Sequence, residues 1–210
     1  MLQYKIIPVT DFQQNSTLLW CDQSQKAALI DPGGEPDLLC SELESRKLIP
    51  EKILLTHAHI DHVGAVAELA RRWSIPIEGP HQADRFWLDS LAEQCQVFGF
   101  PKVESFIPQR WLKQHDQVTV GELLLEVRHC PGHTPGHIIF YHADSKLAWV
   151  GDVLFKGSIG RTDFPQSDTA SLLKCIREQL LPLGDEVRFI PGHGPMSSFG
   201  EERHSNPFLR

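Results

Sequence analysis

Short apolar runs alternate with amphipathic stretches along most of this chain. Eight runs of four or five residues, rich in aliphatic and aromatic side chains, end in polar or glycine-containing turns and therefore predict buried strands. The predicted strands are Lys5–Val9, Ser16–Trp20, Ala27–Ile30, Ile53–Thr56, Leu123–Val127, Ile138–Tyr141, Leu147–Val150 and Val187–Ile190.

Four amphipathic stretches of helical period lie between these runs, at Pro36–Lys47, His62–Trp73, Ala83–Gln94 and Thr169–Leu180. The last two open on Asp or Ser/Thr residues that suit N-caps, and Pro182 ends the last one. Strands come early and again late, each group followed by helices. This order favours an α/β chain with two β-rich halves packed face to face and helices outside, although alternation alone does not fix the layers.

Four of the predicted strands end in a turn that carries His or Asp. These turns contain His57, His133, Asp152 and His193. Open α/β folds place their functional sites at the ends of strands, so the four turns predict a common site at one edge of the sheets.

Length, composition and charge narrow the class of protein. A chain of 210 residues suits one domain, which we expect to span residues 1–210. The net charge of −7 disfavours binding to nucleic acid or to an acidic membrane, since both need a positive face. No apolar run has the length of a signal-peptide core or of a membrane-spanning helix. The five cysteines are widely spaced, which is typical of reduced thiols. We therefore expect a cytoplasmic protein.

Potential metal ligands are most closely spaced in the run His57-Ala58-His59-Ile60-Asp61-His62. In a loop that leaves a strand, His57 and His59 can turn toward one point, while Asp61 and His62 face a second point nearby. Imidazole nitrogens and carboxylate oxygens are ligands of divalent metals such as zinc. The run can begin two adjacent metal sites, and the other strand ends offer the ligands that would complete them.

The remaining histidines are interpreted differently. His81, His115, His129, His142 and His204 stand alone, and we expect surface or hydrogen-bonding roles for them. His137, four residues after His133, is expected to support the site rather than to bind metal. Cys130 is interpreted as a buried packing residue.

Four motifs, THAHIDH, PGHTPGH, GDVLF and PGHGP, resemble in this order the metallo-β-lactamase superfamily. The resemblance implies a four-layer αβ/βα sandwich with a dinuclear metal site at one edge. It implies that His57, His59 and His133 hold the first ion, that Asp61, His62 and His193 hold the second, and that Asp152 bridges them. Two divalent ions are expected, with zinc first and iron or manganese as alternatives.

Within the superfamily, the chain is most similar to short, single-domain bacterial type II glyoxalases, the hydroxyacylglutathione hydrolases. The resemblance rests on PGHTPGH and on Gly151–Pro165. Zinc β-lactamases typically lack an Asp in the place of Asp152, which disfavours a lactam substrate. Only 17 residues follow His193, so we expect the glutathione contacts that two-domain relatives take from a helical C-terminal region to be missing. The resemblance implies that Arg161 occupies the place of a basic substrate-contacting residue, and Lys156 lies nearby. Either can pair with a substrate carboxylate, and the alternative is that both are simply exposed basic residues.

Three functional hypotheses follow from the motifs. The first is hydrolysis of a small-molecule thioester, S-D-lactoylglutathione or a related hydroxyacyl thioester, by a metal-bound hydroxide that the catalytic residue Asp61 orients. The second is a persulfide dioxygenase with a single iron, because Gly160–Phe164 is similar to a motif of those enzymes. The third is a metal-binding protein without catalysis.

Overall fold

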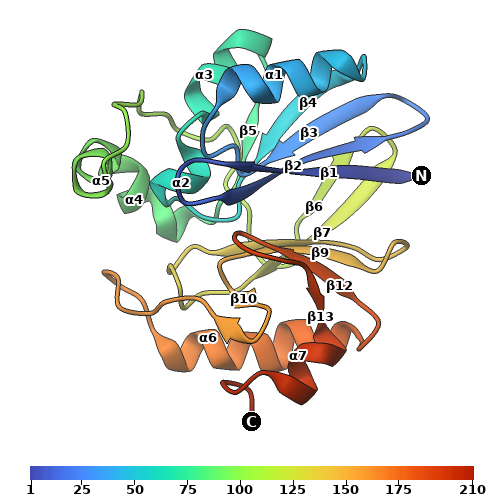
Figure 1. Cartoon of the computed structure of the whole chain (residues 1–210), viewed down its shortest axis with the longest axis vertical. Helices are drawn as coiled ribbons and strands as arrows, with labels where there is room; N and C mark the ends of the chain where they lie inside the picture. The colour runs from blue at the N-terminus through green and yellow to red at the C-terminus, as the bar shows by residue number, and fades with distance from the viewer.

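The computed structural model describes residues 1–210 and arranges the strands in two main sheets that face each other (Figure 1). The first sheet has the order β1-β2-β3-β4-β5, antiparallel from β1 to β3 and parallel from β3 to β5. Its strands are β1 (Leu2–Val9), β2 (Gln14–Cys21), β3 (Lys26–Ile30), β4 (Ile49–Leu54) and β5 (Ile77–Glu78).

The second sheet has the order β13-β12-β9-β8-β7-β6 and is antiparallel except where β12 pairs with β9. Its strands are β6 (Gln117–Val120), β7 (Leu123–His129), β8 (Ile138–His142), β9 (Leu147–Gly151), β12 (Arg188–Pro191) and β13 (Ser197–Ser198). A separate hairpin is formed by β10 (Leu154–Phe155) and β11 (Ser158–Ile159).

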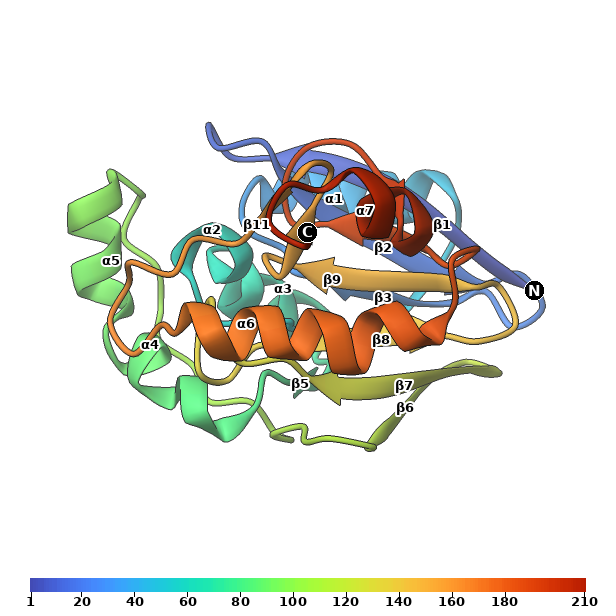
Figure 2. The same ribbon diagram turned by 90° about the horizontal axis from the view of Figure 1, so that it is seen from below.

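Helices cover the outer face of each sheet. In Figure 1, α1 (Pro36–Ser45) and α3 (Val66–Trp73) lie outside the first sheet, and α6 (Thr169–Cys175) and α7 (Phe199–Ser205) lie outside the second. Figure 2 shows α6 running across the second sheet. The short helices α2 (Ile60–Val63), α4 (Arg85–Asp89) and α5 (Leu91–Phe98) lie along one edge. None of these helices combines the length and the apolar character that a membrane crossing requires.

The buried side chains form three clusters, one in each space between layers. On β2, Leu18 belongs to the cluster under α1 and α3, whereas its neighbour Leu19 belongs to the cluster between the sheets. On β8, Phe140 faces the first sheet and Ile139 faces α6. Successive side chains of a strand point to opposite faces, so two-sided burial produces the unbroken apolar runs of the sequence. The expected four-layer α/β sandwich is confirmed.

All eight predicted strands are present, and the errors concern short or interrupted elements. The sequence pattern missed β5, β6, β10, β11, β13 and α7. The predicted helix His62–Trp73 is split into α2 and α3, because the N–H of Ala65 donates to the carbonyl of Pro32. The predicted helix Ala83–Gln94 consists of a 3₁₀ turn (Gln82–Asp84), α4 and α5.

The predicted helix at Thr169–Leu180 is one continuous helical segment, with α6 followed by a π-helical turn at Ile176–Leu180. Asp168 caps it as expected, because its carboxylate accepts the N–H of Ser171. Pro182 lies in a further 3₁₀ turn, Leu181–Leu183, which closes the segment.

The expectation that all five cysteines are reduced is wrong for two of them. Cys130 and Cys175 form a disulfide that joins the segment after β7 to the end of α6, whereas Cys21, Cys40 and Cys95 are free. The fold brings two residues 45 positions apart to a Cα–Cα distance of 5.4 Å. Their spacing in the sequence gives no sign of that contact.

The space between the sheets generates a stability prediction. Phe140 is fully buried there, whereas Leu124 on the adjacent β7 is 44% exposed. Phe140→Ala should lower the free energy of unfolding by about 3–5 kcal/mol, because it removes buried apolar area and leaves a cavity. Leu124→Ala should change it by less than about 1 kcal/mol. Urea denaturation of both variants measures the difference, and equal losses would contradict this assignment of the core.

Candidate metal centre

The polar residues that the sequence predicted for the site converge at one edge of the two sheets. His57 and His59 follow β4, and Asp61 and His62 lie on α2. The others follow strands of the second sheet: His133 in the β7–β8 connection, Asp152 after β9 and His193 after β12. All seven side chains come together, as expected from their places at strand ends.

Three groups of three residues have ligand atoms within 4.8 Å of one another; one of them, Asp31, His57 and His62, shares a histidine with each of the other two. Of these other two groups, the first is His57, His59 and His133, and the second is Asp61, His62 and His193. Asp152 lies between the groups, with one carboxylate oxygen 3.4 Å from His62 Nε2 and the other 3.5 Å from His133 Nε2. The Asp152 carboxylate is thus within reach of both groups. A ligand that bridges two ions needs this position.

Asp31, which the sequence reasoning missed, fixes the protons of two histidines. Its carboxylate accepts the N–H and the hydroxyl of Thr56, and it lies 3.0 Å from His62 Nδ1. Because Thr56 Oγ donates its hydrogen to Asp31, it must accept from His57 Nδ1 at 3.0 Å. Nε2 of His57 therefore carries a lone pair, and Nε2 of neither histidine has a hydrogen-bond partner. Asp31 directly follows a predicted strand, so the same strand-end signal could have identified it.

Backbone carbonyls fix two further rings. His133 Nδ1 donates to the carbonyl of Arg161 at 2.8 Å, and His193 Nδ1 donates to the carbonyl of Phe12 at 3.0 Å. Each bond turns Nε2 toward the interior of the site. Metal-binding histidines characteristically donate the opposite ring N–H to a carboxylate or carbonyl, and this site supplies such acceptors before any ion binds.

Asp152 is positioned by its surroundings. Its backbone N–H donates to His137 Nε2 at 3.0 Å, and the His137 ring stacks on His57. Gly151 has a φ of 48°, and a Cβ there would lie 2.6 Å from both His137 Nε2 and Thr56 Oγ. A glycine is therefore required at this turn. His137 supports the site without belonging to either ligand group, as the sequence predicted.

A second missed carboxylate, Asp84, joins the two loops that carry His57, His59 and His133. It is fully buried and accepts hydrogen bonds from the N–H of Ala58, the hydroxyl of Thr134 and the N–H of Gly136. Burial raises the pKa of Asp84 to about 7, and the three donated bonds oppose that rise. Asp84 looked like an N-cap in the sequence, since only the fold shows that it lies between these loops.

The two groups differ in the pKa values of their histidines. Burial lowers the pKa of His57 and His133 below the usual range, and it lowers the pKa of His59 to about 3. Burial also lowers the pKa of His62 and His193, but neighbouring carboxylates, chiefly Asp152 and Asp61, outweigh it and raise both pKa values. The histidines of the second group therefore keep a proton up to a higher pH than those of the first.

These donors fit divalent metal ions. Imidazole nitrogens and carboxylate oxygens suit zinc, iron and manganese, and three protein ligands per group leave a position open for a substrate or water. Gly192 lets the backbone approach the candidate ligands closely, because a Cβ there would lie 2.1 Å from Asp152 Oδ1 and 2.7 Å from His62 Cε1. Without metal, the Nε2 atoms of His57 and His62 and the buried Oδ1 of Asp152 have no hydrogen-bond partner, at a cost in free energy.

A cavity of about 680 Å³ lies over the candidate ligands and is walled largely by aromatic side chains. Lys156 and Arg161 line it, as the sequence predicted for substrate contacts. Lys156 pairs with Glu201 at 3.0 Å, and Arg161 pairs with Asp163 and lies over the ring of Phe164. Both ion pairs are exposed and therefore weak, so a substrate carboxylate can compete for either cation.

Helix α7 holds the wall of the cavity that carries Lys156. The buried carboxylate of Glu202 accepts the N–H of Gly157, and Asn206 donates to the carbonyl of Ser158. Both bonds reach the β10–β11 hairpin. The segment after His193 thus contributes to the site, although the sequence analysis assigned it no part.

The histidines expected to lie outside the site do so. His81, His115, His129, His142 and His204 belong to neither ligand group. His81 and His129 stack on each other, with His81 capping a 3₁₀ turn, and His142 accepts the N–H of Ser145.

Comparison with known proteins agrees with this geometry. The family model of the metallo-beta-lactamase superfamily matches residues 9–193. Hydroxyacylglutathione hydrolase GloC of Haemophilus influenzae is 46% identical over 209 residues, covering 99% of this chain and 98% of GloC.

Two solved structures are also similar over nearly their whole length. BLEG-1, described as a B3 metallo-beta-lactamase, is 37% identical with a TM-score of 0.91, and the match covers 99% of each chain. TTHA1623, solved in a di-iron-bound form, is 36% identical with a TM-score of 0.89, covering 98% of this chain and all of TTHA1623.

The pKa difference between the groups predicts stepwise proton release on metal binding. An ion at His57, His59 and His133 meets rings with lowered pKa values and should release few protons, whereas an ion at His62 and His193 meets rings with raised pKa values and should displace more. Affinity for the second ion should therefore fall more steeply as pH decreases. Titration calorimetry in buffers of different ionisation enthalpy measures both steps, and equal release at the two steps would contradict the prediction.

The Asp31 network predicts the effect of a distant substitution. Asp31→Asn removes the charge that holds the Nδ1 protons of His57 and His62 in place, so metal affinity should fall by about 10–100-fold. Asp37→Asn, on the exposed start of α1, is the matched control and should bind metal like the parent protein. Competition with a chromophoric chelator gives both affinities, and an unchanged affinity in Asp31→Asn would remove the proposed role of Asp31.

Proposed function

Because this chain belongs to the metallo-beta-lactamase superfamily, we propose that it is a dinuclear-metal hydrolase that cleaves a hydroxyacyl thioester. The observation that carries the proposal is the pair of ligand groups within reach of one carboxylate, Asp152. We assign His57, His59 and His133 to the first ion and Asp61, His62 and His193 to the second, with Asp152 shared. Zinc is the proposed metal, with iron as the main alternative in view of the di-iron form of TTHA1623.

When bound, the two ions would polarise the thioester carbonyl and lower the pKa of a water so that hydroxide is available near pH 7. The reaction adds this hydroxyl to the acyl carbon, breaks the C–S bond, and leaves a carboxylate and a thiol. The cavity lining contains no cysteine, and its one serine, Ser158, has no histidine partner, so no protein nucleophile competes with water.

Asp61 has the central catalytic role in this proposal. One of its oxygens lies 3.1 Å from His193 Nε2 and 3.8 Å from His62 Nε2, at the margin of the cavity. Its carboxylate can accept a hydrogen bond from the attacking water or hydroxide while it remains part of the second ligand group. Asp61 thus orients the attacking hydroxyl and keeps His193 directed inward.

The substrate class rests on the relatives and on the cavity. GloC, similar over its whole length, is named a hydroxyacylglutathione hydrolase, and S-D-lactoylglutathione is the proposed substrate here. Lys156 and Arg161 are the proposed contacts for a glutathione carboxylate, since both line the cavity in weak, exposed ion pairs. The cytoplasmic location and the absence of nucleic-acid or membrane partners stay predictions.

The test combines metal analysis with thioester hydrolysis on one sample. Purified protein should hold about two metal ions per chain and hydrolyse S-D-lactoylglutathione, and Asp152→Ala should lower kcat by at least about 100-fold. Asp144→Asn, in an exposed turn, is the matched control and should retain activity. Full hydrolysis after complete metal removal would falsify the mechanism.

The same sample distinguishes two other activities. One iron per chain with oxygen uptake on glutathione persulfide would instead support the dioxygenase hypothesis. Faster turnover of a β-lactam than of any thioester would support the activity named for BLEG-1. Tight metal binding without turnover of any of these compounds would support a non-catalytic role.

A further inference from the structure

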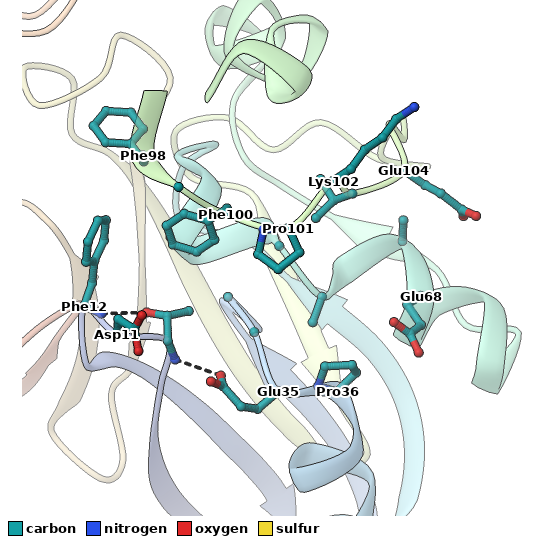
Figure 3. A pocket seen from close by; sticks show the side chains of 18 of the residues that line it. Asp11, Phe12, Glu35, Pro36, Glu68, Phe98, Phe100, Pro101, Lys102 and Glu104 are labelled. Atoms are coloured by element: carbon teal, nitrogen blue, oxygen red, sulfur yellow. Dashed lines mark hydrogen bonds between the residues drawn. The ribbon is translucent and has the colours of Figure 1, made fainter. Parts of the chain in front are cut away.

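Figure 3 shows a second cavity, which has a volume of about 510 Å³. It shares lining residues with the cavity over the metal centre. It is lined by four segments: the β1–β2 turn, the β3–α1 connection, the start of α3 with the residues before it, and the chain after α5. Its volume falls in the range of ligand pockets, about 300–1,000 Å³. No residue proposed as a metal ligand lines it.

The two cavities adjoin at an aromatic partition. Phe12 and Phe98 line both of them. The Phe12 ring packs edge-on against Phe100, with ring centroids 5.4 Å apart, and both rings face the cavity in Figure 3. Phe12 is 46% exposed, so its side chain is not locked into the core. A molecule that reaches past Phe12 and Phe98 can therefore occupy both cavities at once.

Glycine backbone that lines the second cavity, at Gly33 and Gly64, packs closely against the segment that carries Asp61. A Cβ on Gly33 would lie 1.5 Å from the carbonyl oxygen of Asp61, and a Cβ on Gly64 would lie 2.3 Å from the carbonyl oxygen of Gly33. The chain can pack this closely only because both residues are glycines. A ligand in this cavity would thus lie against Gly33 and Gly64, which separate it from the backbone of Asp61 at the start of α2.

Acidic residues outnumber basic residues in the lining of the second cavity. Four acidic and two basic residues line it. Arg71 pairs with Glu104, and Lys102 extends away from Phe12 and Phe100 in Figure 3. The remaining walls are Phe, Pro, Val and Ala side chains, Thr10 and glycine backbone. The excess of acidic residues disfavours a carboxylated group here, whereas an apolar group can be buried against the Phe, Pro and Val side chains.

The cavity over the metal centre differs in that it offers two cations to an anionic group. Lys156 and Arg161 line it on the β10–β11 side. The glutathionyl part of a thioester carries two carboxylates, which these cations can pair with. An acyl group attached at the metal centre then has an apolar path open to it, past Phe12 and Phe98, into the second cavity.

We propose that the second cavity is an acyl-chain subsite, and that the preferred substrates are glutathione thioesters whose acyl group is an extended alkyl or aryl chain. This inference rests on the proposed thioester hydrolysis and deepens it. The glutathionyl carboxylates pair with Lys156 and Arg161, the carbonyl lies at the metal ligands, and the chain continues beside Phe100.

The experiment compares S-D-lactoyl-, S-butyryl- and S-octanoylglutathione as substrates. In the metal-loaded protein, KM should fall by about threefold for each added methylene until the cavity is filled. Ala67→Leu places extra volume in the cavity and should lower the octanoyl-to-lactoyl ratio of kcat/KM by about tenfold or more. Ala92→Leu, exposed on α5, is the matched control and should leave that ratio unchanged.

A second measurement does not depend on hydrolysis. The thioethers S-methyl-, S-butyl- and S-octylglutathione cannot be cleaved, and calorimetry should show affinity rising with alkyl length in the metal-loaded parent protein. Affinities independent of alkyl length, together with lactoylglutathione hydrolysis, would overturn the subsite and leave the proposed function intact. A length-dependent thioether series without cleavage of any thioester would overturn the proposed function while the cavity assignment stands.

Discussion

Burial of polar groups at one edge of the sandwich is the constraint on which the rest of the structure depends. His57, His59, His62, His133 and His137 are all buried there, with Asp31 and Asp152 beside them. In an apolar interior such groups destabilise the fold unless each finds a partner. On the outer side of the site the partners are provided by the protein. They are the Thr56 hydroxyl for His57, the Asp84 carboxylate for the backbone N–H of Ala58, and the carbonyls of Arg161 and Phe12 for His133 and His193. The inner side is left for metal ions.

Much of the architecture could be predicted from the sequence, because buried strands carry apolar side chains on both faces. The runs at Ser16–Trp20 and Ile138–Tyr141 are of this kind, and both are strands. Two-residue strands such as β5 and β10 are too short to show a period. Helix α2 ends early for a tertiary reason, the bond from Ala65 to Pro32, which no local pattern contains.

The candidate site, like the fold, could be predicted only in part from the sequence. The seven proposed ligands could be found because His and Asp side chains at strand ends are a compact and unusual pattern. Asp31 and Asp84 were missed since single carboxylates are common in sequences, and their roles arise from contacts with residues 25 to 52 positions away. The disulfide between Cys130 and Cys175 was missed for the same reason. Local chemistry is readable in the sequence, whereas support from a distance requires the fold.

The carbonyl bonds to His133 and His193 bear on how such a protein can change over evolutionary time. The acceptors are backbone oxygens of Arg161 and Phe12, and a backbone oxygen is present whatever side chain the residue carries. The same two residues direct their side chains to the cavity over the centre. Mutation at either position can therefore alter what the protein recognises while the orientation of the imidazole rings is preserved. Recognition and metal chemistry share these loops, yet they can diversify separately.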